Sequence, residues 1–350
     1  MGRTLLLTEQ DVIDLLSMEE IVNAVEKAFR GLGEGTVINP TKVNLDLGES
    51  GAYPGYNGFM NAMPAYVGFA DLAGLKWAGG NLGERKQRHI PYCSSLIFLV
   101  NPHINNFVAV MDGATITNKR TGAQTTVALK YLYNHGSDER KPIRLGIYGA
   151  GMQGHMQTRA IATKFDIEEV RIYDISKEAL LHYKEDLKDT VKGDIILCDR
   201  PEEAAQGDAV ITVTQANDGF LKEEWIRPGT IVFPMGSYKE ASDQLILAAD
   251  QIIVDHVGQA LHRGALAELA AAGRISEDSI YCTIGDLAAG KRSAQITPDK
   301  RIICLPIGTG CMDIACAGIV YEKALASGRG VPFDFGVSSS TGEEYGWQGR

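Results

Sequence analysis

Three closely spaced glycines are the first residues of this chain that could do chemistry, because together they could hold a dinucleotide. The apolar run Leu-Gly-Ile-Tyr leads into Gly149, Gly151 and Gly154, which have Gly-x-Gly-x-x-Gly spacing. Gly149 and Gly151 let the backbone turn and approach a pyrophosphate, and Gly154 lets the next helix pack closely against its strand. The free N–H groups at the start of that helix, which holds Met152 and Gln153, would then face the phosphates.

A carboxylate follows at the end of the next apolar run. Asp174 closes the run Glu-Val-Arg-Ile-Tyr and lies 20 residues beyond Gly154, where an acid accepts hydrogen bonds from an adenosine ribose. Because a carboxylate repels a 2′-phosphate, Asp174 favours NAD over NADP as the cofactor. The alternative is a glycine loop without a nucleotide and an aspartate that caps a turn. The strand-like run before the loop and the helix-like stretch from Met152 to Lys164 favour the dinucleotide site.

Two cations upstream could hold a substrate. Lys76 lies inside the apolar run Gly-Leu-Lys-Trp-Ala, where period-two alternation places its neighbours on the opposite face of a strand. Arg120 lies near the start of an expected helix and could form a bidentate pair with a carboxylate. Periodicity leaves open whether the Lys76 amine reaches solvent and Arg120 forms a surface salt bridge. The seven scattered histidines form no catalytic grouping with Ser or Cys, so nucleophilic hydrolysis has no support.

Composition indicates a globular protein that handles small molecules. The chain has 350 residues, of which 45% are apolar and 22% charged, which suits two domains of ordinary size. A net charge of −10 argues against a nucleic-acid or anionic-membrane partner. Six dispersed cysteines without a Cys-x-x-Cys pair indicate neither a zinc site nor a disulfide framework and fit a reducing cytoplasm. Without a signal-like or membrane-spanning apolar run, we expect a cytoplasmic protein.

The first part of the chain carries helix signals and then strand signals. Capping-box spacings at Thr8 and Ser17 predict a helical N-terminal segment. Residues 39–110 mix strand-like runs with Gly, Pro and Asn and predict a mostly antiparallel sheet. Its expected strands are Thr41 to Leu47, Ala73 to Ala78, Ser95 to Val100 and Phe107 to Met111. An expected helix from Ile116 to Tyr133 and a polar linker ending at Pro142 follow, and a domain boundary belongs there.

The second part alternates buried-type strands with helices. This alternation predicts a parallel sheet covered on both faces, so the fold class is α/β with a Rossmann doubly wound sheet of strand order 3-2-1-4-5-6. The expected strands are Arg144 to Tyr148, Val170 to Tyr173, Asp194 to Cys198, Ala209 to Thr214, Thr230 to Met235 and Gln251 to Val254. A helix from Gly308 to Ser327 and a loosely ordered polar tail from Gly328 to Arg350 complete the expected chain.

Taken together, the residues resemble the ornithine cyclodeaminase and mu-crystallin family, which includes archaeal-type alanine dehydrogenases and ketimine reductases. The resemblance covers nearly the whole chain, and its late helix resembles the family pattern Gly-x-Ala-x-x-Asp-x-Ala with Cys311 where Leu or Met is usual. Its anchors are Met63-Pro64-Ala65-Tyr66, the strand of Lys76, Val110 to Gly113, Lys119 to Thr121, the Gly149 fingerprint, Val213-Thr214, Pro228 to Thr230 and Gly308 to Ala315.

The resemblance implies an architecture. A substrate-binding and dimerisation domain would be formed by residues 1–133 and completed by residues 308–350. The NAD-binding Rossmann domain would be formed by residues 142–307. The protein would be a homodimer. The resemblance also implies roles for single residues. Lys76 and Arg120 would hold and polarise the carboxylate end of a small amino or imino acid, and hydride would pass between the substrate Cα and the nicotinamide. Thr121, Thr214 and Gly236 would contact the cofactor.

Two residues depart from the family pattern. Lys42 stands where many members have an arginine, so it would pair with a substrate carboxylate as a point charge without a bidentate fork. Tyr238 stands where ornithine cyclodeaminases and alanine dehydrogenases of the family have an aspartate that handles protons or the substrate amine. We include both residues in the predicted substrate site. The obvious base for an amine-activating cyclisation is missing, which argues against an ornithine cyclodeaminase.

A cation-rich loop directly follows the Lys76 strand. It contains Arg85 and Arg88 and could bind a second carboxylate, as in a dicarboxylic imine such as iminosuccinate. A solvated loop explains the same charges equally well.

The sequence therefore predicts an NAD-dependent oxidoreductase that acts on the CH–NH bond of a small L-amino acid, or in reverse as an imine reductase. Two alternatives remain at this point. One is a lyase that converts ornithine to proline and ammonia with NAD retained, and the other is a non-catalytic binding protein of the mu-crystallin type.

Overall fold

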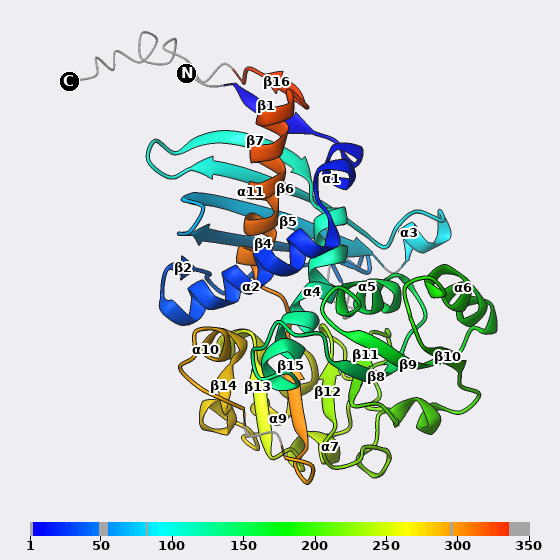
Figure 1. The fold of residues 1–350 in the computed structure, drawn as a ribbon. Coiled ribbons are helices and arrows are strands. Elements are labelled where there is room, and N and C mark those ends of the chain that lie inside the picture. The colour runs from blue at the N-terminus through cyan, green and yellow to red at the C-terminus, as the bar shows by residue number, and fades with distance from the viewer. Residues whose placement is uncertain (1–2, 49–54, 82, 295–296, 336–350) are drawn as a thin grey trace.

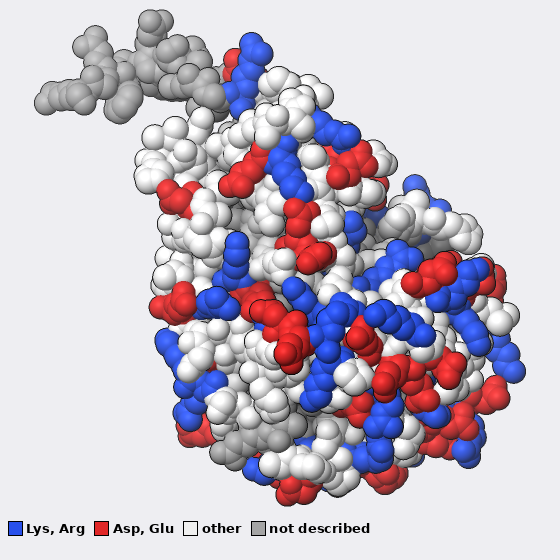
Figure 2. Space-filling model, viewed as in Figure 1, with Lys and Arg blue, Asp and Glu red and all other residues white. Residues whose placement is uncertain are grey.

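Strands of the chain form two eight-stranded sheets, one above the other in Figure 1. The computed structural model describes residues 3–48, 55–81, 83–294 and 297–335. The predicted α/β class with a second, mostly antiparallel layer is confirmed. Figure 2 shows acidic and basic side chains mixed over the lower part of this face, while the upper part is mostly uncharged.

The first sheet is mostly antiparallel, as predicted. Its strands run in the order β16-β1-β7-β6-β5-β4-β2 with β3 paired to β4, and only β1 and β7 are parallel neighbours. The members are β1 (Thr4–Leu7), β2 (Val37–Ile38), β3 (Val43–Asp46), β4 (Gly58–Val67), β5 (Leu72–Asn81), β6 (Cys93–Asn101), β7 (Asn106–Asp112) and β16 (Val331–Phe333).

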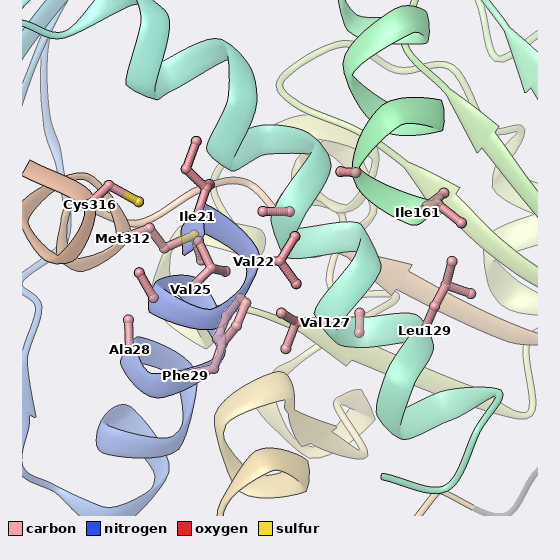
Figure 3. Close-up of a cluster of buried hydrophobic side chains, with 14 of the residues drawn as sticks. Ile21, Val22, Val25, Ala28, Phe29, Val127, Leu129, Ile161, Met312 and Cys316 are labelled. Atoms are coloured by element: carbon pink, nitrogen blue, oxygen red, sulfur yellow. The ribbon is translucent and has the colours of Figure 1, made fainter. Parts of the chain in front are cut away.

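Four helices pack near one face of this sheet, and α11 crosses that face in Figure 1. They are α1 (Glu9–Leu15), α2 (Met18–Glu34), α4 (Ala114–Leu132) and α11 (Gly310–Ser327), and a short α3 (Glu84–Gln87) follows β5. The predicted capping boxes at Thr8 and Ser17 start α1 and α2. Phe29 of α2 lies near Val127 of α4 in the buried cluster of Figure 3, and each such side chain contributes roughly 1.5–3 kcal/mol on burial.

The second sheet is wholly parallel and has the order β10-β9-β8-β11-β12-β15-β13-β14. Its strands are β8 (Pro142–Tyr148), β9 (Asp166–Tyr173), β10 (Asp194–Leu197), β11 (Ala209–Thr212), β12 (Ile231–Pro234), β13 (Gln251–Val254), β14 (Cys282–Thr283) and β15 (Ile302–Leu305). The α-helices along it are α5 (Met152–Ile161), α6 (Lys177–Leu187), α7 (Asp243–Leu247), α8 (Val257–Ala260), α9 (Ala267–Ala271) and α10 (Ile284–Ala288). Its 3-10 turns are η1 (Pro201–Ala205), η2 (Glu223–Trp225), η3 (Gly264–Leu266) and η4 (Glu277–Ser279).

The predicted strand order 3-2-1-4-5-6 holds for the first five strands and is wrong beyond them. β15, the last strand of this sheet in the chain, lies between β12 and β13, and β14 occupies the edge. All four residues of β15 are buried. The sequence interpretation missed this strand because so short an apolar run cannot be told from a buried helix segment by periodicity.

The two ends of the chain also correct the sequence interpretation. The N-terminal segment starts with β1, which pairs with β7 before the helices begin, and the predicted loose tail contains β16, which pairs with β1. An unpaired strand edge can bind an extended segment that reaches it, so β1 adds to the edge of β7 and β16 adds to the edge of β1. The rest of the predicted tail, residues 336–350, lies outside the described residues. α4 ends at Leu132 and β8 begins at Pro142, but the division into domains stays a prediction.

Candidate active site

The glycine loop between β8 and α5 has the geometry that a dinucleotide needs. Gly149 has a φ of +106°, and a Cβ there would lie 2.9 Å from the Val213 carbonyl oxygen. A Cβ on Gly154 would lie 2.2 Å from the Gly149 oxygen, so only glycine lets the helix approach its strand. A Cβ on Gly151 would meet no atom within 4 Å, and no side chain caps α5 at this residue. The open helix start therefore fits a pyrophosphate.

Asp174 directly follows β9, beside this loop. Its Oδ2 accepts a hydrogen bond of 2.7 Å from the Ala150 N–H, and its Oδ1 accepts one of 2.8 Å from the Ser176 N–H. The carboxylate thus fixes the shape of the phosphate loop. A cavity of about 550 Å³ opens next to Gly151 and Ser176. Whether Asp174 also binds the adenosine ribose stays a prediction.

Replacement of Asp174 tests that prediction. Asp174→Ala should weaken NADH binding about tenfold or more, because it removes charge-assisted hydrogen bonds to ribose and loop. It should also narrow the preference for NADH over NADPH, because the carboxylate that repels a 2′-phosphate is gone. Fluorescence titration with both cofactors measures this, and Asp194→Ala at the far end of β10 is the control. A wild-type protein that prefers NADPH would contradict the ribose assignment.

Lys76 lies on the buried face of the first sheet. The register places it in one row with Met63, Ile97 and Met111, which come from the neighbouring strands β4, β6 and β7. Its side chain is 1% exposed and forms an ion pair with Asp313 of α11, at 2.8 Å between Nζ and Oδ2. The alternative in which the amine reaches solvent is therefore wrong.

Arg120 binds the same carboxylate from the other side. Its Nε lies 3.2 Å from Asp313 Oδ1, and neither side chain is more than 7% exposed. The alternative of a surface salt bridge is wrong for this residue as well. Asp313 therefore joins the two predicted substrate cations, although β5, α4 and α11 are far apart in the sequence. Burial and the neighbouring Arg120 charge lower the pKa of Lys76 to about 8, while Asp313 opposes the shift.

Lys42 belongs to the same cluster, as predicted. Its Nζ donates a hydrogen bond of 3.3 Å to the Ile307 carbonyl. Burial and the positive charge of Arg263 lower the pKa of Lys42 to about 7, Asp255 opposes this, and Arg120 and Lys76 add to it. Lys42 is half-buried, and the carbonyl it binds belongs to the residue before Gly308, which lies against the Arg120 guanidinium.

Asp255 and Gly308 complete the cluster. Gly308 has a φ of +94°, and a Cβ there would lie 2.6 Å from Nη1 of Arg120, so glycine makes room for the guanidinium. Asp255, directly after β13, accepts a 2.5 Å hydrogen bond from the Gly308 N–H. Burial raises the pKa of Asp255, while the Gly308 N–H and Lys42 oppose the rise.

Sequence reasoning gave no role to Asp255 or Asp313, although each carried a signal. Asp313 is a lone acid in the apolar run from Cys311 to Ala315, and Asp255 follows a fully apolar stretch of β13. A charge in such a setting needs a buried partner.

The predicted cofactor residues outside the glycine loop lie on adjacent elements. Thr121 lies on α4, where its carbonyl accepts a hydrogen bond of 3.3 Å from Gln157 of α5. Thr214 follows β11, and Gly236, with a φ of +84°, follows β12. Tyr238 lies in the same loop as Gly236. Their contacts with a cofactor or substrate stay predictions.

The two arginines predicted to bind a second carboxylate have different surroundings. Arg88 is 68% exposed and pairs with Glu84, which favours a solvated position. The Arg85 Nε donates a 2.5 Å hydrogen bond to the Pro91 carbonyl. Burial raises the pKa of the Cys93 thiol, and the charges of Lys76, Arg85 and Arg120 oppose the rise. Binding of a second carboxylate stays a prediction.

A Rossmann sheet with a glycine loop, next to a buried cluster of cations and carboxylates, defines the class of nucleotide-dependent enzymes that act on small acids. Comparison with known proteins narrows this class. The model of the ornithine cyclodeaminase/mu-crystallin family matches residues 3–328. The chain belongs to this family.

Three similar proteins span almost the whole chain. An alanine dehydrogenase of Archaeoglobus fulgidus is 32% identical over 335 residues, which are 95% of this chain and 98% of the relative. The solved structure of an archaeal alanine dehydrogenase dimer with bound NAD has a TM-score of 0.83 at 31% identity, covering 95% of this chain and 99% of that one. The Δ1-pyrroline-2-carboxylate reductase of Thermococcus litoralis, solved with NADH and L-proline, also has a TM-score of 0.83, at 27% identity over 94% of this chain and 99% of that one.

Proposed function

We propose that this protein is an NAD-dependent oxidoreductase that acts on the CH–NH bond of a small L-amino acid, or on the corresponding imine in the reverse direction. The observation that carries the proposal is the convergence of Lys76 and Arg120 on one buried carboxylate, with the half-buried Lys42 bound to the carbonyl of Ile307 beside Gly308. Such a group of cations attracts a carboxylate. The family membership, the NAD or NADH in two solved relatives and the fit of the glycine loop support NAD as the cofactor.

The cations and the acids of the cluster have different proposed roles. The cations hold the substrate carboxylate, which fixes Cα and its nitrogen and supplies the orientation on which most of the rate depends. NAD supplies the hydride acceptor when it is bound. An amino acid whose amine has first lost its proton becomes an iminium cation when it loses hydride, and the buried acids Asp313 and Asp255 offset that positive charge. The electrostatics of the pocket thus suit both the acid end and the nitrogen end of the substrate.

A substrate panel tests the proposal against its alternatives. L-amino acids are offered with NAD, and 2-oxo acids with ammonia or methylamine are offered with NADH, and NADH absorbance is followed. Acidic and neutral substrates in the panel examine the Arg85 prediction. Steady formation or consumption of NADH supports the oxidoreductase. Release of ammonia from ornithine without net NADH would replace it with the cyclodeaminase, and tight ligand binding without any turnover would replace it with a binding protein.

Localisation and partners are part of the proposal. All six cysteines are free, which suits a reducing cytoplasm. No helix in the described ranges is long and apolar enough to cross a membrane. The net charge of −10 favours small-molecule partners over nucleic acid. We also propose residues 1–133 with 308–350 as the substrate-binding and dimerisation domain, and residues 142–307 as the NAD domain.

The proposed homodimer has a surface that fits it. Trp77 of β5 and Leu96 of β6 are cross-strand partners. Trp77 directly follows Lys76 and Leu96 directly precedes Ile97, and both Lys76 and Ile97 point to the buried face. Trp77 and Leu96 therefore point away from α11, where they are 41% and 49% exposed. Val43 and Leu45 on β3 are 66% and 50% exposed. Exposed apolar side chains gathered on one sheet indicate a protein interface, and the solved archaeal relative is a dimer.

Charge on this surface should break the dimer. Trp77→Asp combined with Leu96→Asp is expected to give a monomer, because two buried, unpaired carboxylates per subunit would cost several kcal/mol at the interface. Analytical ultracentrifugation measures the mass. Leu181→Asp, at a more exposed apolar position on α6, should stay dimeric. If the double variant keeps the dimer mass, the interface lies elsewhere.

A further inference from the structure

Glu240 is a fully buried carboxyl group that the proposed chemistry does not use. It lies in the loop after β12 and is 0% exposed. Its Oε1 accepts two hydrogen bonds of 2.6 Å, from the backbone N–H and from the hydroxyl of Thr214. Thr214 follows β11, which is adjacent to β12 in the sheet (Figure 1). The carboxyl group therefore joins the loops that leave two neighbouring parallel strands.

The hydroxyl of Thr214 connects Glu240 to the backbone of Ala216. Because that hydroxyl donates its single hydrogen to Glu240, its lone pairs are free to accept, and one accepts a 3.1 Å hydrogen bond from the Ala216 N–H. Loss of the acceptor at Glu240 would release the Thr214 backbone and let its hydroxyl rotate. The conformation of residues 214–216 thus depends on one side chain from another loop.

Backbone hydrogen bonds join the two loops further along. The Leu221 N–H donates to the Glu240 carbonyl at 2.9 Å, and the Gly219 N–H donates to the Lys239 carbonyl at 2.8 Å. The Lys239 N–H donates to Asn217 Oδ1 at 2.7 Å. The two loops form one unit around the buried carboxyl group. They lie outside the carboxyl ends of parallel strands, where ligands of open α/β sheets bind.

We propose that Glu240 is a positioning residue, which holds residues 214–216 and the loop from Gly236 in the conformation that receives the nicotinamide end of NAD. This inference rests on the proposed cofactor role of Thr214 and Gly236. A carboxylate suits the task better than an amide. It only accepts hydrogen bonds, whereas a glutamine would bring an NH₂ group that needs its own buried acceptor.

Burial also makes this carboxyl group titrate near neutrality. It raises the pKa of Glu240 to about 7, and the hydrogen bonds from Thr214 limit the rise. The charged side chain nearest in sequence, Lys239, pairs instead with Asp243 and Glu268. Above this pKa the carboxylate accepts strongly from Thr214, and below it the added proton weakens that bond. Binding of the nicotinamide end should therefore weaken as the pH falls through about 7.

Two ligands separate positioning from general stability. NADH carries the nicotinamide end, whereas ADP carries only the adenosine end, so isothermal titration with both reports on each half of the site. Glu240→Ala should weaken NADH about tenfold and leave ADP affinity within about twofold. Glu240→Gln keeps one acceptor and should lose less. Glu268→Ala removes an exposed neighbouring acid and should change neither affinity.

The pH profile is the second measurement. Wild-type affinity for NADH should fall between about pH 8 and about pH 6, whereas Glu240→Gln should show no such fall. Equal losses of NADH and ADP affinity with a lower melting temperature of the apo protein would make Glu240 a structural residue and overturn the inference. Unchanged NADH affinity in Glu240→Ala would also overturn it. A wild-type protein that binds ADP but not NADH would refute the proposed function itself.

Discussion

Replacement of Lys76 should abolish most turnover while the protein still binds NADH. The amine is buried against Asp313 in the center of the cation cluster, so Lys76→Met removes a charge that the substrate carboxylate needs, with little change in volume. Truncation of one partner in a buried, hydrogen-bonded charge pair costs about 2–5 kcal/mol. If this whole free energy is lost from stabilisation of the transition state, kcat/KM decreases about 30- to 5,000-fold. NADH affinity should change little, because the glycine loop lies in the other sheet.

The measurement combines steady-state kinetics with NADH titration. Lys184→Ala, an exposed lysine on α6, controls for the loss of one positive charge and should retain wild-type kinetics. Lys76→Met with normal turnover would remove this residue from the active site. Loss of NADH affinity with retained kcat would assign Lys76 to the cofactor instead of the substrate.

Much of the fold could be predicted from the sequence because local signals and burial agree there. Capping boxes at Thr8 and Ser17 fix the starts of two helices, and long apolar strands such as β8 and β9 lie where the apolar runs predict them. β15 could not be placed in this way. Its position between β12 and β13 depends on which strand edges are free after the rest of the sheet has formed, and no residue of β15 encodes that.

The same limit applies to the site. Lys76 could be selected because a cation in an apolar run is costly unless it has a partner or a use, and Arg120 because the family resemblance assigns it a role. The sequence could not show that one carboxylate, Asp313, lies between them. Asp313 follows Lys76 by 237 residues and Arg120 by 193 residues in the chain. Asp255 and Glu240 follow strand ends, where side chains meet only once the strand order is known. Which side chains lie next to each other in a site thus depends on the topology of the fold, and composition and periodicity do not predict it.

Replacement of Asp313 should have the largest effect on stability. Asp313→Asn keeps the shape of the side chain but leaves Lys76 and Arg120 facing each other, both nearly buried. Loss of one member of a buried ionic group costs about 3–5 kcal/mol, because the remaining charges have neither water nor a counterion. A loss of this size is a large fraction of the stability of a typical domain. Thermal and urea denaturation should show it, with Asp243→Asn on α7 as the control.

A second substitution in the same cluster distinguishes this cause from simple misfit. If uncompensated charge destabilises Asp313→Asn, then Lys76→Met in that background removes one of the two cations and should recover part of the lost stability. The double variant would then be more stable than the sum of the single losses predicts. Both variants are expected to lack turnover, so recovered stability without recovered activity would show that the buried charges serve substrate binding and that Asp313 makes their burial tolerable. Strictly additive losses would show instead that Asp313 stabilises α11 independently of the cations.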